Sequence, residues 1–389
     1  MKQRISLCYA LVQAAIWGSY GFLFSFANRY LLARGLSSLR IGLILGVATG
    51  IAFLLQPLLT ALSDRFRFFS CRRILVLCAG FMTLCAAALL LRLTTPVIIV
   101  LYAFATVCLQ ALPAFANALG MNAIRNGKTL NFGVSRGIGS VLFGVAAQVA
   151  IPLIDRFGLN TVPFCSAVLG ILLMTAVLAF PELEKRAEEP AEQPTPALAF
   201  FRANGRFALL LVGVVLLYIG HNALSNCMYQ IAVYKGDGNA QGTALLIAAF
   251  VELPTMFLFT KLLKLAKCER WLCLSCVFFT LRLALTLLLP GVYGLYAAQL
   301  AQMLGFALFA VSSVYYVGMV IDKRDVVKGQ TYLAVANTLG CLIAHFLGGA
   351  LIDGVGVGMA LVIFTVLSIL GGAISIGAVV SKPAAKQPA

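Results

Sequence analysis

Long apolar segments alternate with short polar segments along the whole chain. Twelve runs of about 20 predominantly apolar residues recur, and each is long enough to cross a bilayer as an α-helix. The pattern therefore predicts an all-α integral membrane protein with twelve transmembrane helices. We place these helices at 5–30, 39–62, 73–93, 96–122, 131–154, 161–180, 206–232, 241–263, 271–289, 293–320, 330–352 and 357–380.

A polar stretch interrupts this pattern between the sixth and seventh spans. Residues 181–196 read PELEKRAEEPAEQPTP, which is too polar and too rich in proline to form a packed core. The stretch therefore predicts a linker between two bundles. We expect an N-terminal six-helix bundle at 1–180, a cytoplasmic linker at 181–205, a C-terminal six-helix bundle at 206–380 and a cytoplasmic tail at 381–389.

A short sequence repeat supports a relation between the two halves. The segment 153–158 reads LIDRFG at the end of the fifth predicted helix, and 351–356 reads LIDGVG at the end of the eleventh, 198 residues later. Two pseudo-symmetric bundles related by an axis along the membrane normal are typical of transporters that bind solute near the middle of the bilayer.

Composition agrees with a membrane protein. The 389 residues are 61% hydrophobic and 11% charged, whereas soluble domains carry about 25% charged residues. The net charge of +16 comes from short basic clusters between apolar runs. Such clusters indicate topology rather than a nucleic-acid interface.

The positions of Lys and Arg predict the orientation of the chain. With both termini in the cytoplasm, 21 of the 29 basic residues lie on the inner face, 6 lie on the outer face and 2 lie within spans. The chain has short loops and no N-x-[ST] glycosylation sequon. We therefore expect a multi-pass protein of a bacterial inner membrane.

Three charged residues lie inside the predicted spans. Glu252 is the one carboxylate deep in a span, with Pro254 two residues later, and Arg282 lies in the next span. Because a buried carboxylate is costly unless it is neutralised or paired, Glu252 is a candidate proton carrier. The alternative is a structural ion pair between Glu252 and Arg282.

Arg136 opens the fifth predicted helix among several glycines, in the sequence NFGVSRGIGSVLFG. Small residues let helices approach closely, so the guanidinium would point into the bundle interior. The alternative is an arginine that snorkels to the inner membrane surface.

Polar residues at helical spacing form stripes on five spans. Gln13 shares a face of the first helix with Trp17, Tyr20 and Asn28, and Gln299 shares a face of the tenth with Gln302 and Tyr316. Such faces must meet protein or water inside a bilayer, so they predict a polar cavity; the alternative is interhelical hydrogen bonding without a cavity. The substrate-binding candidates are Trp17, Tyr20, Asn117, Arg136, His221, Asn222, Asn226, Glu252, Gln302, Tyr316 and Asn337.

Proton-coupling candidates are the residues whose charge can change inside the bundle or that pair with such a group. Histidine titrates near neutrality, and both histidines of the chain lie within spans. His345 is therefore a candidate, with a structural interhelical histidine as the alternative. The proton-coupling candidates are Glu252, Arg282 and His345.

The stretch 52–73, AFLLQPLLTALSDRFRFFSCRR, passes from an apolar helix into a cluster of charge. It resembles the loop between the second and third helices of the major facilitator superfamily, in which an Asp and a following basic residue stand among glycines. The family glycines are Thr60 and Arg67 here. The resemblance implies a gating role for Asp64 and Arg65.

Within that superfamily, the chain resembles the lactose permease-like branch of oligosaccharide and nucleoside proton symporters. Arg136 and Glu252 fall on the sugar-contacting arginine and glutamate of that branch, and Arg282 falls on its coupling arginine. Other family positions differ. The carboxylate, stacking tryptophan, histidine and proton-carrying glutamate of the branch are replaced by Asn117, Phe143, Gln302 and Gly305.

These observations together predict a secondary active transporter that moves a small polar solute, such as a sugar or nucleoside, by alternating access with proton symport. The alternatives are an exporter or uniporter of an organic anion or drug-like solute, and a membrane sensor without transport. An enzyme is not expected, because one deep carboxylate and two separated histidines supply no nucleophile–base or metal constellation. We expect a monomer in the lipid bilayer, with no cofactor or metal and no nucleic-acid partner, and H⁺ as the coupling ion.

Overall fold

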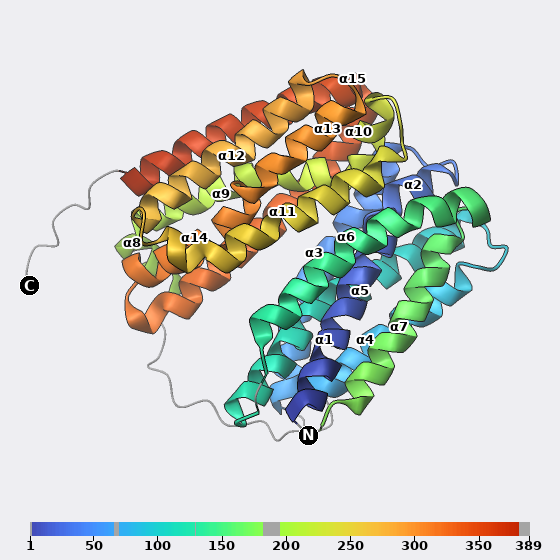
Figure 1. Cartoon of the computed structure of the whole chain (residues 1–389), viewed down its shortest axis with the longest axis horizontal. Helices are drawn as coiled ribbons and strands as arrows, with labels where there is room; N and C mark the ends of the chain where they lie inside the picture. Colours follow the sequence, from blue (N-terminus) through green and yellow to red (C-terminus); the bar gives the residue numbers. More distant parts are fainter. Residues whose placement is uncertain (1, 66–69, 129, 182–194, 381–389) are drawn as a thin grey trace, which may run out of the picture. The chain divides into compact units, whose positions relative to one another are not determined.

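The computed structural model describes residues 2–65, 70–128, 130–181 and 195–380, without the side chains of residues 2–4 and 64. Figure 1 shows that this part of the chain is built from helices, and 11 of them are long and apolar enough to span a membrane. The expected all-α membrane fold is confirmed. The helical elements are α1 Lys2–Ser19, η1 Tyr20–Phe24, α2 Ala27–Leu32, α3 Ser38–Arg65, α4 Cys71–Ala88, α5 Thr95–Arg125, α6 Phe132–Phe157, α7 Thr161–Ala179, α8 Ala197–Ala203, α9 Gly205–Asn226, α10 Met228–Tyr234, α11 Ala240–Leu262, α12 Cys268–Leu288, α13 Gly291–Leu300, η3 Ala301–Met303, α14 Phe306–Val320, η4 Lys323–Asp325 and α15 Val326–Val380.

The last candidate span contains two of the predicted helices. Helix α15 has 55 residues and a non-helical residue inside it, Gly356, with φ 81° and ψ 165°. The spans predicted at 330–352 and 357–380 lie on either side of this kink. The count of 11 long helices is therefore consistent with the expected twelve membrane crossings.

Three spans that the sequence pattern predicts as continuous are interrupted. The first is α1, the π-helical turn η1 and α2, with the break at Phe26 (φ −96°, ψ 8°). The seventh breaks at Cys227 (φ −95°, ψ 19°) between α9 and α10. The tenth is α13, the 3₁₀ turn η3 and α14, with Gly305 at φ −84° and ψ −101°. The first and seventh spans thus break with the same backbone conformation, which supports the internal repeat.

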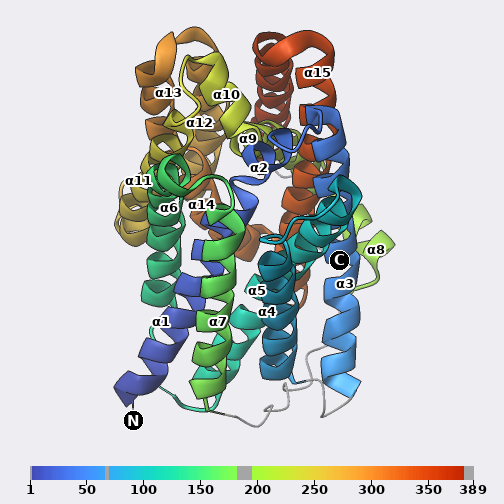
Figure 2. The ribbon, with the colours of Figure 1, turned by 90° about the vertical axis from the view of Figure 1, so that its right-hand side faces the viewer.

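The described residues belong to two compact units. The larger unit comprises Met1–Glu188 together with Ser225–Phe250 and His345–Val357. In it, α1 lies beside α6 and α7, and α4 lies beside α5 and α7 (Figure 2). The smaller unit comprises Glu189–Leu224, Val251–Ala344 and Gly358–Ala389. The expected division into bundles at 1–180 and 206–380 stays a prediction, and most of the linker, residues 182–194, lies outside the described part.

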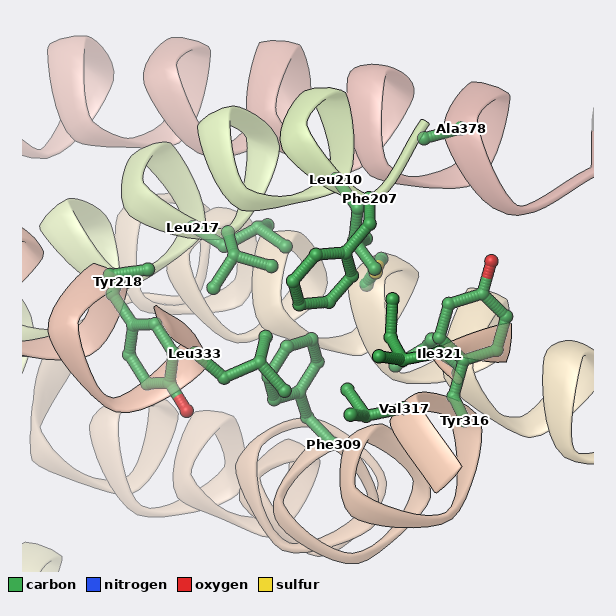
Figure 3. Close-up of a cluster of buried hydrophobic side chains, with 14 of the residues drawn as sticks. Phe207, Leu210, Leu217, Tyr218, Phe309, Tyr316, Val317, Ile321, Leu333 and Ala378 are labelled. Atoms are coloured by element: carbon green, nitrogen blue, oxygen red, sulfur yellow. The ribbon is translucent and has the colours of Figure 1, made fainter. Parts of the chain in front are cut away.

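The smaller unit has its own apolar core. Figure 3 shows part of this core, and its labelled side chains come from α9, from α14 with the following Ile321, and from α15. Aromatic rings pack edge to face in this cluster: the Tyr218 and Phe309 ring centroids are 5.7 Å apart. These contacts fix α9 against α14, and thereby position the polar residues one turn further along α9.

Within the larger unit, residues of the first half contact the segments 225–250 and 345–357; we call this contact surface the seam. Glycines bring helix backbones together along it. A Cβ atom on Gly42 would collide with the carbonyl oxygen of His345, and one on Gly349 would lie 2.9 Å from the carbonyl carbon of Ser38. A Cβ on Gly242 would lie 2.8 Å from the carbonyl oxygen of Ala147. The seam is therefore closely packed, backbone against backbone.

Candidate functional site

The first polar cluster surrounds Trp17 in the larger unit. The guanidinium carbon of Arg136 lies 3.9 Å from the centroid of the Trp17 ring, and Arg136 Nη1 donates to Ser140 Oγ at 3.1 Å. Tyr20 stacks on Trp17 with ring centroids 5.1 Å apart. A cation over an indole ring gains about 0.5–2 kcal/mol, more when the pair is desolvated. We name Gln13, Trp17, Tyr20, Asn117 and Arg136 the Trp17 cluster.

The local sequence explains why Arg136 and Trp17 meet. Gly139 lies one turn after Arg136 on α6, and a Cβ there would be 2.5 Å from the Trp17 ring. Only glycine leaves room for the indole against α6. Trp17 Nε1 donates to Gln13 Oε1 at 3.2 Å, and Gln13 Nε2 reaches Asn117 Oδ1 at 3.4 Å. Arg136 is therefore turned toward the bundle interior, against an aromatic ring and amide groups.

The second polar cluster surrounds Arg282 and Glu252 in the smaller unit. Both are buried, with 3% and 9% of their surface exposed. Arg282 Nε and Nη2 donate to Gln299 Oε1, at 3.1 Å from Nε, and Arg282 Nη1 lies 3.1 Å from His221 Nδ1. Glu252 Oε1 accepts from Gln302 Nε2 at 2.8 Å. We name these five residues the Glu252 cluster.

The interruption of the tenth span positions two of these residues. Gln299 lies in the last turn of α13 and donates from its own amide to the Leu295 carbonyl at 3.1 Å, while Gln302 lies in the 3₁₀ turn η3. The other amide atom of Gln302, Oε1, is buried without a hydrogen-bond partner. Gln302 therefore binds Glu252 through its N–H group, and its carbonyl oxygen remains available as an acceptor in the same cluster.

Aromatic rings enclose His221. It stacks on Phe306, the first residue of α14, with centroids 4.8 Å apart and an interplanar angle of 10°. Phe279 meets it edge on at 5.3 Å. Because Arg282 is a donor only, His221 Nδ1 accepts this hydrogen bond and the imidazole presents Nδ1 without a proton. His221 is thus held in one tautomer by its neighbours.

The alternative of a structural ion pair between Glu252 and Arg282 stays a prediction. The charge of Glu252 acts on Arg282 across the cluster, and each group also has hydrogen bonds to neutral side chains. Gln302 holds the carboxylate, and Gln299 with His221 holds the guanidinium. Each charged group therefore keeps its hydrogen-bond partner when the charge of the other changes.

Other predicted substrate residues have hydrogen bonds to residues outside the two named clusters. Asn222 donates to Asn337 Oδ1 at 3.3 Å in the smaller unit. Asn226 Nδ2 lies 3.3 Å from Nε2 of His345 in the seam, where His345 is buried and meets Phe24 edge on. These residues stay predictions as substrate contacts.

Two further expectations concern the ends of the smaller unit and of α3. Tyr316 lies in the hydrophobic cluster of Figure 3, among apolar side chains. Arg65 is exposed and ends α3. The side chain of Asp64 lies outside the described part, so the gating role of both residues stays a prediction.

Asn28 departs from the face on which the sequence places it. The spacing in the first span puts it with Gln13, Trp17 and Tyr20, but Asn28 is buried in the seam and bonds to Asn226 O at 2.6 Å and to Gln230 Nε2 at 2.8 Å. The π-helical turn η1 lies between these positions, and a wider turn rotates all following residues about the helix axis.

Sequence reasoning did not select the two glutamines that position the charged and aromatic groups. Gln13 and Gln299 lie on the recognised stripes, and each is buried, with 1% and 0% of its surface exposed. The sequence feature that could have identified them is a polar side chain about one helical turn from an aromatic or charged candidate residue. Among the described residues, no three His, Cys, Asp or Glu side chains are placed to hold a metal ion.

One motif could suggest an enzyme. Residues 133–137 read GVSRG, which has the Gly-x-Ser-x-Gly spacing of a nucleophile elbow. The elbow needs a strand-to-helix turn, whereas this segment lies on the first turns of α6, where buried Ser135 donates to the Asn131 carbonyl at 3.0 Å. Ser135 is a helix residue bonded to its own backbone.

Comparisons with known proteins agree with this architecture. The model of the MFS_1 like family, where MFS denotes the major facilitator superfamily, matches residues 4–363. A solved structure of a mutant of the nucleoside transporter NupG has a TM-score of 0.81 at 17% identity and covers 97% of this chain and 99% of its own. A bacterial homolog of the human lysosomal transporter Spinster, in an inward-facing and unoccupied conformation, has a TM-score of 0.72 at 13% identity, with 97% of each chain covered. No curated protein sequence matches significantly.

The family match confirms the resemblance to the major facilitator superfamily, and the solved structures share the fold. Proteins with this family and fold are membrane transporters and not enzymes. The chain belongs to the MFS_1 like family and is a multi-pass secondary transporter.

Proposed function

We propose that this chain is a proton-coupled symporter for a small polar solute, such as a sugar or nucleoside. The observation that carries the proposal is the Glu252 cluster, in which a buried carboxylate is held by a neutral amide beside a buried guanidinium. We further propose a bacterial inner membrane, cytoplasmic termini, a monomer and no cofactor. The Lys and Arg distribution supports the orientation.

Gln302 suits a carboxyl group that gains and loses a proton. An amide offers two N–H donors and a carbonyl acceptor, so it can bond either form of Glu252 by turning around. Its donor meets Glu252 Oε1 at 2.8 Å, and its acceptor Oε1 is without a partner. A protonated Glu252 would become a donor, for which that acceptor is available. Glu252 is therefore the proposed proton carrier.

The Trp17 cluster suits a ring that carries hydroxyl groups. Arg136 supplies donors, Gln13 and Asn117 supply amides, and the Trp17 and Tyr20 rings supply an apolar surface. Sugars and nucleosides combine a flat or puckered ring with several hydroxyls, and amides and arginine are the groups that bind them in proteins. The fold shared with the nucleoside transporter NupG supports this solute class.

A second candidate is an exporter or uniporter of an organic anion. The two polar clusters contain two guanidinium groups, of Arg136 and Arg282, and one carboxyl group, of Glu252. This excess of positive charge favours a carboxylate or phosphate on the solute. Competition between neutral and anionic analogues for uptake separates the two candidates.

The test is the external pH of a lightly buffered suspension of proteoliposomes pulsed with sugars, nucleosides and organic acids. Symport predicts alkalinisation with one compound and none with its stereoisomers. Radiolabelled exchange without any pH change would contradict proton coupling and would leave a uniporter. In that case Glu252 and Arg282 would be a structural pair.

A further inference from the structure

The seam carries the internal repeat at one of its ends. The repeated segments are 153–158 and 351–356, and the glycine that closes each has the same backbone conformation: φ 78° and ψ 178° at Gly158, φ 81° and ψ 165° at Gly356. Asp155 and Asp353 therefore occupy equivalent positions in two equivalent turns. Both lie in the larger unit.

Asp353 caps a helix from the other half of the chain. Its Oδ1 accepts from Ser38 N at 3.1 Å and its Oδ2 accepts from Leu39 N at 2.7 Å, in the first turn of α3. The nearby Ser37 Oγ accepts from Arg40 N at 3.4 Å. The first amides of a helix lack intrahelical partners and carry partial positive charge, so a carboxylate there is favourable. The cap for α3 thus comes in part from a residue about 315 positions away.

The helices α3 and α15 are closely packed beside Asp353. A Cβ on Gly349 would lie 3.0 Å from Leu39 Cα, and one on Gly42 would collide with the His345 carbonyl oxygen. The backbones of α3 and α15 are therefore in direct contact one turn from the carboxylate. The two bonds of Asp353 form only while this end of the seam is closed.

Asp155 makes the matching contact more loosely. Its oxygens accept from Asn239 Nδ2 at 3.2 Å and 3.5 Å, and Asn239 immediately precedes α11. Arg29 Nη2 lies 3.8 Å from Asp155 Oδ1, and the side chain of Asp155 is 50% exposed. Asp155 therefore reaches α11 through a side chain, whereas Asp353 reaches α3 through backbone amides.

We propose that Asp353 and, more weakly, Asp155 are the gating residues that reversibly hold this end of the seam closed. Both connect an element of one half to an element of the other, and both are exposed to solvent. When the seam opens, water replaces the carboxylate as the hydrogen-bond partner of the helix amides. The free-energy cost of opening is therefore small enough for the motion to be reversible. The gating proposal rests on the proposed function in one respect only, which is that this end of the seam lies at the outer face of the membrane.

The chain contains a reporter for this motion. Cys227 lies at the break between α9 and α10, is 6% exposed, and would be 3.0 Å from a Cβ on Gly348 in the seam. In reconstituted full-length protein whose other ten cysteines are replaced by serine or alanine, the labelling rate of Cys227 by a membrane-impermeant maleimide measures opening. The variants are Asp353→Ala, Asp353→Asn and Asp155→Ala.

Asp237→Ala is the matched control. Its carboxylate also accepts a backbone amide, Asn239 N at 2.8 Å, but within its own segment. We expect Asp353→Ala to raise the labelling rate about tenfold, consistent with the loss of a helix cap. Asp353→Asn retains one acceptor and should give an intermediate increase, and Asp155→Ala a smaller one. Asp237→Ala should give no more than Asp155→Ala, because Asp237 reaches the seam only through the backbone of Asn239.

Equal rates in all four variants and the parent would overturn the proposal, as would an increase in Asp237→Ala equal to that in Asp353→Ala. A variant that fails to fold is identified by its loss of monodispersity in detergent. If Asp353→Ala fails to fold, the proposal is tested with Asp353→Asn. Labelling requires no solute. A failure to find proton-coupled uptake therefore would not contradict the gating role of Asp353 and Asp155. Unchanged labelling would not contradict the proposed function.

Discussion

At the scale of single residues, the buried groups Glu252 and Arg282 both have hydrogen bonds to neutral side chains. Glu252 bonds to Gln302, and Arg282 bonds to Gln299 and His221. An amide partner lets the carboxyl group of Glu252 change its charge while its position is kept, because the amide can bond either form. A proton carrier needs this property.

This arrangement predicts a specific defect for Glu252→Gln. Glutamine keeps an acceptor for Gln302 but binds no proton, so uptake driven by a pH gradient should fall to the level of empty vesicles. Exchange of labelled for unlabelled solute needs no net proton movement and should stay within about threefold of the parent, less than 1 kcal/mol. Both are measured in the same proteoliposomes.

Glu269→Gln is the control for that substitution. Glu269 lies in the first turn of α12, in the same unit, outside the Glu252 cluster. Its variant should retain gradient-driven uptake. Accumulation by Glu252→Gln at the parental level would show that the proton is carried elsewhere.

Gln299 predicts a second effect at this scale. Leucine in its place removes the oxygen that accepts from two nitrogens of Arg282, and a buried hydrogen bond to a charged group contributes about 1.5–3 kcal/mol. Solute uptake by Gln299→Leu should therefore fall at least about tenfold at an equal amount of protein in the membrane. Gln299→Glu keeps an acceptor and should retain more activity; uptake by the leucine variant equal to the parent would contradict the positioning role.

The sequence alone identifies the charged residues but not their partners. Glu252, Arg282 and Arg136 stand out because charge is rare in apolar segments. Gln299 and Gln302 are separated from their partners by 17 and 50 positions. No spacing rule within one helix joins such pairs, since their contact depends on how α11, α12, α13 and η3 are packed.

At the scale of elements, helix interruptions place the polar groups. Gly305 marks the break in the tenth span, and glycine is a readable signal there. The breaks at Phe26 and Cys227 carry no Gly or Pro at the position itself, and the surrounding sequence stays apolar. Hydropathy therefore predicts the spans correctly but cannot show that two of them turn before they end.

The repeated glycine turns give a prediction at this scale. Alanine at Gly356 must adopt φ 81° and ψ 165°, a conformation that costs a residue with a side chain about 1–3 kcal/mol. Gly356→Ala should lower the melting temperature in detergent by about 2–6 °C. Gly318→Ala is the control, because Gly318 lies on helix α14 with open space around it and alanine favours a helix. Equal melting temperatures for both variants would contradict the assigned turn.

At the scale of the whole molecule, the orientation can be tested with one side chain. Lys235, between α10 and α11, is the one lysine that the predicted topology puts on the outer face. Partial burial lowers the pKa of its amine, which increases the fraction of the reactive neutral form at a given pH. An impermeant amine reagent applied to intact cells should therefore label the protein at Lys235.

Lys235→Arg keeps the charge and removes the reactive amine, so the signal from intact cells should disappear. Permeabilised cells should label equally well with either form, since the other lysines are then accessible. Undiminished labelling of Lys235→Arg in intact cells would mean that another lysine faces outward and that the orientation is reversed or incomplete.

The contact between Arg136 and the indole of Trp17 also makes the transporter its own spectroscopic probe. The chain has two tryptophans, and the other, Trp271 in the first turn of α12, donates at 2.9 Å to the carbonyl of Leu262, the last residue of α11. Indole fluorescence responds to a cation 3.9 Å from the ring. With Trp271 replaced by phenylalanine, any solute that draws Arg136 away changes the emission of the single remaining tryptophan. Solute binding can then be titrated by fluorescence, without a radiolabel and before any transport occurs.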